Sequence, residues 1–344
     1  MRTLLVTGGL GFIGSNYVLS AAKSGNFSQI LNIDSLSYGA NPKNLAELNG
    51  KPEYRFIKSS ITDPEAVGKA VGEANIVVHF AAETHVDRSI STPEMFLETN
   101  VRGTFNLLEA ARKSKVAKFV HISTDEVYGS APKGMSFKED QPGNPSSPYA
   151  ASKAASEMFV TAYHKTYGLP TTILRCTNNF GPRQFPEKFI PKTILMAIRS
   201  GKIPIYGDGL QIRDWIYVAD FCNAINLAIE KGRDGSIYNV SMGNEISNLD
   251  VAKMVLATLG RPSDLLQFVE DRPGHDLRYS LDSGRIRQEL GWKPEHSFPE
   301  ALEHTVKWYV DNRAWWEPLV NAKVLSATPW KEQWKELETT HNRR

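Results

Sequence analysis

Two adjacent carboxylates and a Tyr/Lys pair occupy one stretch of this 344-residue chain. Asp125 and Glu126 follow an apolar run, and Tyr149 and Lys153 come after a segment rich in Pro and Gly. A tyrosine and a lysine one helical turn apart can act together, so that the phenolate takes a hydroxyl proton while a nicotinamide takes the hydride. The carboxylates are candidates for the acid and base that would expel a poor leaving group. The stretch therefore indicates more than a hydride transfer.

Both signals also have simpler interpretations. A loop aspartate that caps a turn, beside a solvated glutamate, is the commoner origin of an acidic pair, and a Tyr-x-x-x-Lys spacing often occurs by chance. Here Thr124 and the acidic pair begin where a strand is expected to end, and the carboxyl ends of parallel strands are where doubly wound folds place their chemistry. The position of these residues favours the catalytic interpretation.

A glycine-rich turn follows the first expected strand. Gly8, Gly11 and Gly14 have the spacing that allows a tight turn, a close approach to a pyrophosphate and close helix packing. Asp34 falls 20 residues after Gly14, at the end of the second expected strand, where a carboxylate would bind the ribose hydroxyls. Asp34 is followed by Ser35-Leu36-Ser37 and not by an arginine that could bind a 2′-phosphate, which favours NAD over NADP.

The first half of the chain alternates β-branched runs with helical patterns, which predicts a doubly wound parallel sheet of the Rossmann type. The expected strands are Thr3–Thr7, Gln29–Asp34, Glu53–Lys58, Ala74–Phe80, Ala117–Ser123 and Thr171–Arg175. Long helices are expected at Pro93–Ser114 and Pro148–Tyr167, and shorter ones at Lys188–Ser200, Ala219–Glu230 and Leu249–Leu259.

These patterns suggest an NAD-binding domain over 1–176, although later segments could return to its sheet. A smaller mixed α/β region over 177–328 would bind the substrate, and a tail over 329–344 would carry Trp330 and Trp334 on a packed or solvated helix.

Composition limits the classes of function. The net charge of +2 comes from interspersed acids and bases, so no basic stripe indicates a nucleic-acid partner. Cys176 and Cys222 are too few for a disulfide framework or a metal site, and no metal is expected. The sequence shows neither a signal-peptide core nor a stretch long enough to span a membrane. We therefore expect a cytoplasmic protein with no membrane partner.

Several long strings resemble the dTDP-glucose 4,6-dehydratase family of the extended short-chain dehydrogenase/reductase superfamily. They span residues 8 to about 282 and include AAETHVDRS at 81–89, STDEVYG at 123–129, RCTNNFGP at 175–182, PEK at 186–188, YGDG at 206–209, RDW at 213–215 and RPGHD at 272–276.

The resemblance implies an internal redox cycle with tightly bound NAD. Tyr149, supported by Lys153 and Thr124, would remove the 4-hydroxyl proton of the glucose while its C4 hydride passes to NAD. The resulting ketone acidifies the C5 hydrogen, so Glu126 could remove it while Asp125 protonates the departing 6-hydroxyl. The hydride would return to C6, giving a 4-keto-6-deoxy sugar and restoring NAD.

The resemblance also implies the binding residues. The cofactor would contact Gly8, Gly11, Phe12, Ile13, Gly14, Asp34, Ser35, Leu36, Ser37, Ser60, Ile61, Phe80, Ala81, Ala82, Thr99, Tyr149, Lys153 and Asn179. The nucleotide sugar would contact Thr84, Thr124, Asn178, Lys188, Phe189, Pro204, Tyr206, Arg213, Asn248, Arg272 and His275, with the two arginines on the diphosphate. Where the family usually has Asp-Ile this chain has Ser60-Ile61, although Asp63 lies close. His85 and Asp87 are expected to shape their loop and not to react.

Other interpretations stay open at this point. UDP- or CDP-glucose could replace dTDP-glucose, and a nucleotide-sugar 4-epimerase would need the Tyr/Lys pair but no further acid and base. A non-catalytic NAD-sensing protein is a third possibility. The family commonly forms homodimers through a four-helix bundle, for which Pro93–Ser114 and Pro148–Tyr167 are candidates.

Overall fold

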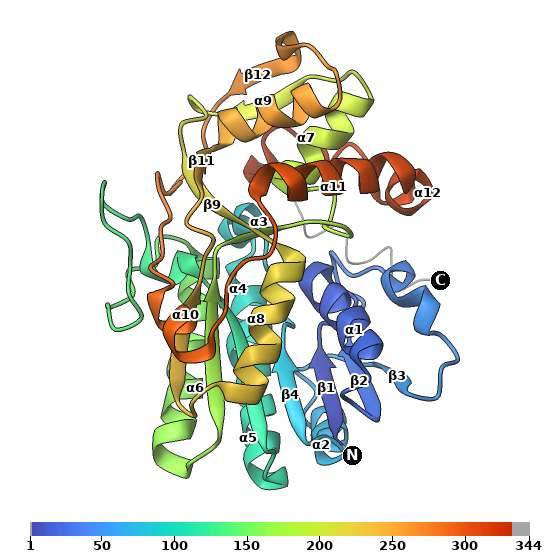
Figure 1. The fold of residues 1–344 in the computed structure, drawn as a ribbon, viewed down its shortest axis with the longest axis vertical. Coiled ribbons are helices and arrows are strands. Elements are labelled where there is room, and N and C mark those ends of the chain that lie inside the picture. Colours follow the sequence, from blue (N-terminus) through green and yellow to red (C-terminus); the bar gives the residue numbers. More distant parts are fainter. Residues whose placement is uncertain (1, 332–344) are drawn as a thin grey trace.

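A seven-stranded parallel sheet forms the centre of the larger lobe (Figure 1). The structure is a computed structural model that describes residues 2–331. Spatially the strand order is β10-β6-β5-β4-β1-β2-β3. The strands are β1 (Thr3–Thr7), β2 (Gln29–Asp34), β3 (Tyr54–Lys58), β4 (Ile76–His79), β5 (Lys118–Thr124), β6 (Thr171–Cys176) and β10 (Ser236–Val240).

Helices cover both faces of this sheet. On one face α1 (Phe12–Ser24), α8 (Val218–Lys231) and α10 (Gly284–Leu290) bury a core that includes Tyr17 and Phe221. On the other face α2 (Pro64–Gly72), α5 (Gly103–Ser114) and α6 (Pro148–Tyr167) bury a core that includes Leu107 and Val160. The predicted doubly wound, Rossmann-type architecture is confirmed. Its strand order reverses between β1 and β4, and ligands bind in such folds at that crevice.

The expected helix over Pro93–Ser114 is interrupted. After α3 (Val86–Ser91), the chain forms α4 (Pro93–Phe96), a π-helical segment over Leu97–Arg102 and then α5. The carbonyl of Asn100 accepts hydrogen bonds from the hydroxyls of Thr104 and Ser156, and its side-chain amide donates to Ser152 on α6. These hydrogen bonds accompany the wider turn of the π-helical segment. The apolar periodicity of the sequence does not reveal that segment.

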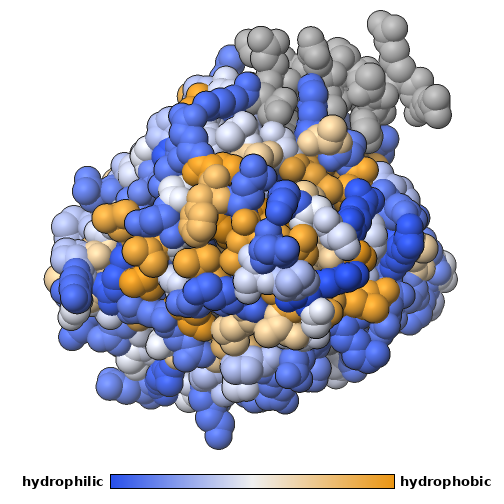
Figure 2. Space-filling view, turned by 90° about the horizontal axis from the view of Figure 1, so that it is seen from above, coloured by the Kyte–Doolittle hydropathy of each residue, from blue (hydrophilic) through white to orange (hydrophobic). Residues whose placement is uncertain are grey.

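The second lobe contains two small sheets. One consists of β7 (Asn178–Phe180), β9 (Ile212–Tyr217) and β11 (Glu245–Ser247), and the other of β8 (Ile203–Tyr206) and β12 (Leu266–Val269). Helices α7 (Phe189–Ile198), α9 (Asn248–Thr258), α11 (Phe298–Asp311) and α12 (Arg313–Trp316) pack around them. Figure 2 shows the molecule from above, with hydrophobic residues gathered toward the middle of the face and hydrophilic ones between and around them.

The chain crosses between the lobes more than once. After β7, α7, β8 and β9 have built much of the second lobe, α8 and β10 return to the large sheet, where β10 pairs with β6. The domain boundary at residue 176 stays a prediction. From the sequence alone, later segments could return to the large sheet, and α8 and β10 do so. Within the expected tail, Pro329–Lys331 form a short 3-10 helix, whereas Trp334 lies outside the described residues.

Candidate active site

The glycine-rich turn between β1 and α1 is tightly packed. Gly8 has φ +72°, and a Cβ there would lie 2.7 Å from the Cα of Ala81. A Cβ on Gly14 would lie 2.4 Å from the carbonyl oxygen of Gly8. Helix α1 begins after Gly11, whose position offers no side-chain cap, so the first N–H groups of the helix can donate to a pyrophosphate. Gly9 was not among the predicted cofactor residues. Its position is equally crowded, because a Cβ there would lie 2.3 Å from Asn32 Oδ1.

Asp34 ends β2 beside this turn. Its carboxylate accepts hydrogen bonds from the backbone N–H of Leu10, at 2.9 Å, and of Leu36, also at 2.9 Å. Burial raises the pKa of Asp34, and these two backbone donors oppose that effect. Ser35 and Ser37 are exposed on the loop that follows. The uncapped helix end and the strand-end carboxylate fit the pyrophosphate and ribose of NAD.

Other predicted cofactor residues have the following surroundings in the structure. Ala81 donates its N–H to Thr7 Oγ1, and Phe80 packs 5.6 Å from the ring of Tyr17. Asn179 lines the neighbouring pocket, and its Oδ1 has no hydrogen-bond partner among the described residues. Phe12 and Ile13 begin α1, Ala82 follows Ala81, and Thr99 lies within the π-helical segment.

The Ser60 segment departs from the family pattern in a specific way. Ser60 Oγ lies 2.7 Å from Thr62 Oγ1 and accepts the N–H of Thr62. Asp63 caps α2 by accepting the N–H groups of Glu65 and Ala66. Ile61 is buried. Asp63 therefore already has a structural task, and Ser60 offers a hydroxyl where the family offers a carboxylate.

Helix α6 positions the Tyr/Lys pair. Ser147 caps the helix by accepting the N–H of Ala150, and Tyr149 and Lys153 then lie one turn apart. Lys153 Nζ donates to the carbonyl of Ile122 at 2.7 Å, and burial lowers its pKa to about 8.

The surrounding protein raises the pKa of Tyr149 well above its usual value. Burial contributes most, and the nearby carboxylate of Glu126 adds to it, whereas a hydrogen bond with Thr124 opposes the shift. A phenolate at Tyr149 therefore depends on positive charge that these neighbours do not supply, such as that of an oxidised nicotinamide ring.

Thr124 connects the end of β5 to the acidic pair. Its hydroxyl donates to Asp125 Oδ1 at 3.1 Å and accepts the N–H of Glu126 at 3.2 Å, which caps the 3-10 helix Asp125–Tyr128. Asp125 is 3% exposed, and its Oδ2 has no partner among the described residues. Burial raises its pKa well above the usual value, and Glu126 raises it further. A buried carboxyl group of this kind favours the protonated form, as a general acid requires.

Glu126 has a different environment. It lines the pocket, and Tyr279 donates a long hydrogen bond of 3.4 Å to Oε2. Burial raises the pKa of Glu126, but the positive charges of Arg272, Lys188 and Arg213 oppose the shift. Two neighbouring carboxyl groups whose surroundings differ in this way are suited to separate acid and base roles. Glu126 is the better candidate for the base.

A buried network holds the turn that carries both carboxyl groups. Tyr128 ends the turn, stacks 4.9 Å from the ring of Phe137 and donates to Asn239 Oδ1 at 3.0 Å. Arg175 donates to the Tyr128 hydroxyl at 2.5 Å and forms a buried ion pair with Glu157 of α6 at 2.6 Å. The turn is therefore anchored to α6, β6 and β10.

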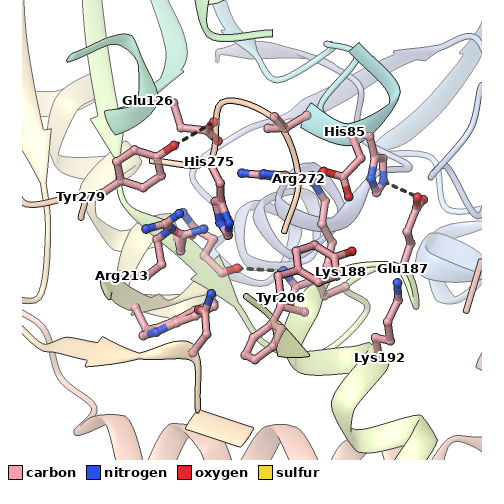
Figure 3. A pocket seen from close by; sticks show the side chains of 18 of the residues that line it. His85, Glu126, Glu187, Lys188, Lys192, Tyr206, Arg213, Arg272, His275 and Tyr279 are labelled. Atoms are coloured by element: carbon pink, nitrogen blue, oxygen red, sulfur yellow. Dashed lines mark hydrogen bonds and ion pairs between the residues drawn. The ribbon is translucent and has the colours of Figure 1, made fainter. Parts of the chain in front are cut away.

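A pocket opens beside Glu126, and residues of both lobes line it (Figure 3). Nine predicted substrate residues line it: Asn178, Lys188, Phe189, Pro204, Tyr206, Arg213, Asn248, Arg272 and His275. Two others do not line it: Thr84 is exposed, and its carbonyl accepts Lys188 Nζ at 3.0 Å, while Thr124 supports Asp125. The prediction did not include His85, Val86, Asp87, Gln184, Glu187, Lys192, Trp215 and Tyr279, which also line the pocket.

The pocket is suited to an anion. Arg213, Arg272 and Lys188 point into the same space in Figure 3. Arg272 Nη1 pairs with Asp87 at 2.9 Å, while its buried Nε has no partner among the described residues. Arg213 donates to two backbone carbonyls and lies 4.1 Å over the ring of Tyr279. These cations can bind a diphosphate, and the residues of 2–331 contain no cluster of three or more metal-ligating side chains.

His85 and Asp87 shape the pocket wall. His85 Nε2 lies 3.3 Å from Glu187 Oε2, and Asp87 holds Arg272. Burial lowers the pKa of His85 well below its usual value, as do the nearby positive charges, so the ring is neutral. Sequence reasoning assigned both residues to the loop and missed their contacts with Glu187 and Arg272.

The raised pKa of Asp125 leads to a stability prediction for Asp125→Asn. Because the folded-state pKa lies above the unfolded value of about 3.9, the folded protein binds more protons, and stability falls as pH rises above that value. Asparagine removes this penalty, so the variant should melt higher at pH 8, by roughly 2 °C per kcal/mol relieved. The gain should shrink toward pH 4 in calorimetric scans.

The exposed Asp264 provides the control, since Asp264→Asn should leave the melting temperature nearly unchanged at both pH values. A lower melting temperature for Asp125→Asn at pH 8 would contradict the inferred penalty.

Together, the doubly wound fold, the Tyr/Lys pair and the cationic pocket define the extended short-chain dehydrogenase/reductase class. Residues 5–305 match the family model described as GDP-mannose 4,6 dehydratase, and the chain belongs to that family.

Curated and solved relatives agree with this assignment. A dTDP-glucose 4,6-dehydratase from Streptomyces niveus is 45% identical over 330 residues, which cover 95% of this chain and 98% of that protein. The crystal structure of DesIV, a dTDP-glucose 4,6-dehydratase from Streptomyces venezuelae with NAD bound, is 46% identical with a TM-score of 0.90, and covers 92% of this chain and 100% of that one. A UDP-glucose 4-epimerase from Thermus thermophilus, in complex with NAD, is 32% identical with a TM-score of 0.84, covering 90% and 99%.

Proposed function

We propose that this protein is an NAD-dependent hydro-lyase that converts dTDP-glucose to dTDP-4-keto-6-deoxyglucose. The observation that carries the proposal is the pair Asp125 and Glu126, whose differing environments suit an acid and a base, at the strand end beside Tyr149. The similarity to dTDP-glucose 4,6-dehydratases over nearly the whole chain supports it.

The residues divide the reaction between them. NAD, held by the glycine-rich turn and Asp34, would supply the acceptor for the C4 hydride and the donor of the same hydride to C6. Tyr149 takes the proton of the 4-hydroxyl, and the 4-ketone that results makes the C5 hydrogen acidic. Glu126 then removes the C5 proton while Asp125 gives its proton to O6, which leaves as water. A proton returned to C5 completes the 4-keto-6-deoxy sugar.

The pocket accounts for substrate binding in this proposal. Arg213 and Arg272 bind the diphosphate, and the Nε of Arg272 is available for it. Tyr206 and His275, whose rings lie 6.2 Å apart, line the part of the pocket assigned to the nucleotide. Both side chains carry an aromatic face against which a base can pack.

A 4-epimerase is the second candidate, because an epimerase shares the fold. An epimerase returns the hydride to C4 and has no use for a protonated carboxyl group at O6. The acidic pair and the higher identity to dehydratases, 45% against 32%, favour dehydration.

Mass spectrometry distinguishes these functions. After incubation with dTDP-glucose, the product should be lighter than the substrate by one water, and the purified protein should release NAD on acid denaturation. A product of unchanged mass would overturn the dehydratase proposal.

Turnover of dTDP-, UDP- and CDP-glucose measured side by side should be highest for dTDP-glucose.

We also propose a homodimer formed through a four-helix bundle, to which each subunit contributes the helical stretch Pro93–Ser114 and helix α6. Leu97, Met158 and Phe159 are 57%, 73% and 40% exposed, which is unusual for large apolar side chains grouped on neighbouring helices. Phe105 packs 6.1 Å from Phe159 and links the two helices. Light scattering should give twice the chain mass of 38.4 kDa.

A cytoplasmic location is part of the same proposal. Cys176 and Cys222 are both buried free thiols, which suits a reducing compartment. No helix among residues 2–331 is long and apolar enough to cross a membrane.

A further inference from the structure

Tyr38 lies where three segments of the chain meet. It belongs to the loop after β2, four residues beyond Asp34, the proposed ribose ligand. His85 and Arg88 come from α3 and its cap, and Glu187 comes from the loop before α7 in the second lobe. Contacts among these residues therefore connect the cofactor loop to both walls of the substrate pocket.

The contacts around Tyr38 are specific. Its hydroxyl donates a hydrogen bond to Glu187 Oε2, the same oxygen that lies 3.3 Å from His85 Nε2. The guanidinium of Arg88 lies 4.2 Å over the Tyr38 ring, and the rings of His85 and Phe185 lie 5.4 and 4.9 Å away. Figure 3 shows His85 and Glu187 facing each other at the edge of the pocket.

Burial makes the hydrogen bond to Glu187 consequential. The side chain of Glu187 is only 3% exposed, and burial raises its pKa, whereas the Tyr38 hydroxyl favours the ionised form. The other oxygen, Oε1, has no partner among the described residues, and Glu187 lines the substrate pocket. A buried carboxylate with so few donors depends strongly on each one it has.

Tyr38 lies on the loop that begins at Asp34, so its hydrogen bond to Glu187 starts from the loop proposed to bind the cofactor. Asp34 holds the start of the loop through the N–H of Leu36, and Asn41 closes its end by donating its N–H to the carbonyl of Leu10. Between these points Ser35 and Ser37 are exposed, whereas Tyr38 reaches across to the second lobe. The Tyr38–Glu187 hydrogen bond thus ties the ribose-binding edge to the opposite lobe.

We infer that Tyr38 and Glu187 form a clasp that slows the release of NAD. The inference rests on the proposed function, in which the same NAD must remain bound between hydride removal and hydride return. Tyr38 acts by positioning the loop, and His85 and Arg88 hold Tyr38 and Glu187 in place.

The test uses the purified holoenzyme and the variant Tyr38→Phe, which keeps the ring over which Arg88 lies and removes only the hydroxyl. A hydrogen bond to a charged group contributes enough for NAD to dissociate about tenfold faster or more, measured by trapping released NAD. NAD retained per chain after gel filtration should fall, and added NAD should restore turnover. Unfolding temperatures with saturating NAD should fall by only a few degrees, because one hydrogen bond is lost from a large fold.

The matched control is Tyr217→Phe, because the Tyr217 hydroxyl makes no hydrogen bond among the described residues, and its removal should leave NAD release unchanged. In a double-mutant cycle, Tyr38→Phe and Glu187→Gln should accelerate release less than the product of their separate effects. Release from Tyr38→Phe within twofold of the wild-type rate, or equal acceleration by Tyr217→Phe, would overturn the clasp. Wild-type protein purified without NAD would overturn both the clasp and the proposed function.

Discussion

A Glu126→Gln variant should oxidise C4 of the sugar and then stop before losing water. Glutamine keeps the shape of the side chain but cannot accept the C5 proton, and the removal of a positioned general base lowers a rate by about 10²- to 10⁴-fold. In a single turnover the absorbance of reduced nicotinamide should therefore rise and persist. In heavy water, the C5 hydrogen should not exchange.

Several observations can contradict this assignment. Normal turnover by Glu126→Gln would remove Glu126 from the mechanism, and absent C4 oxidation would show that its charge matters to the first step. Glu289→Gln is a suitable control, because Glu289 on α10 accepts a hydrogen bond from Tyr238 of β10 and does not line the pocket, so this variant should leave turnover unchanged.

The largest loss in the oxidation step is expected for Tyr149→Phe. This change removes only the phenol oxygen. Without that oxygen, Tyr149 on α6 can no longer accept the proton of the 4-hydroxyl. Turnover should fall by about 10²- to 10⁴-fold, and no reduced nicotinamide should form in a single turnover. The fold should persist, because the ring itself remains packed 6.3 Å from Phe96.

The Tyr149→Phe and Glu126→Gln variants should therefore stop the reaction at different points. Tyr54→Phe controls for the loss of a phenol oxygen. The Tyr54 hydroxyl accepts a hydrogen bond of 2.9 Å from Asn32 Nδ2 and takes no part in the proposed reaction. Reduced nicotinamide formed by Tyr149→Phe at the wild-type rate would rule out Tyr149 as the base.

Much of the large sheet could be predicted because its strands are short apolar runs with clear ends. Thr3–Thr7 and Gln29–Asp34 agree with β1 and β2 to the residue, and Pro148–Tyr167 agrees with α6, which has a Ser cap and Pro in its first turn. The π-helical segment at Leu97–Arg102 was missed, and one contact that accompanies it, from Ser156 of α6 to the carbonyl of Asn100, joins residues that are distant in the sequence.

The candidate site was predicted unevenly for a related reason. Residues within one string, such as Asp125 and Glu126, could be found locally. Partners brought together only by folding could not: Tyr38 and Glu187 are separated by 149 residues, and Tyr128 and Asn239 by 111. The direction of the Tyr149 pKa shift was also beyond the sequence, because it depends on burial and on the carboxylate of Glu126, which folding brings close.

The late return of β10 has a consequence for synthesis on the ribosome. Strand β6 is complete at residue 176, but its partner β10 ends only at Val240, after a large part of the second lobe has been made. Until then a nascent chain exposes one edge of β6, and an unpaired strand edge can associate with other chains. Chaperone demand during translation should therefore be greatest while residues 177–240 are emerging.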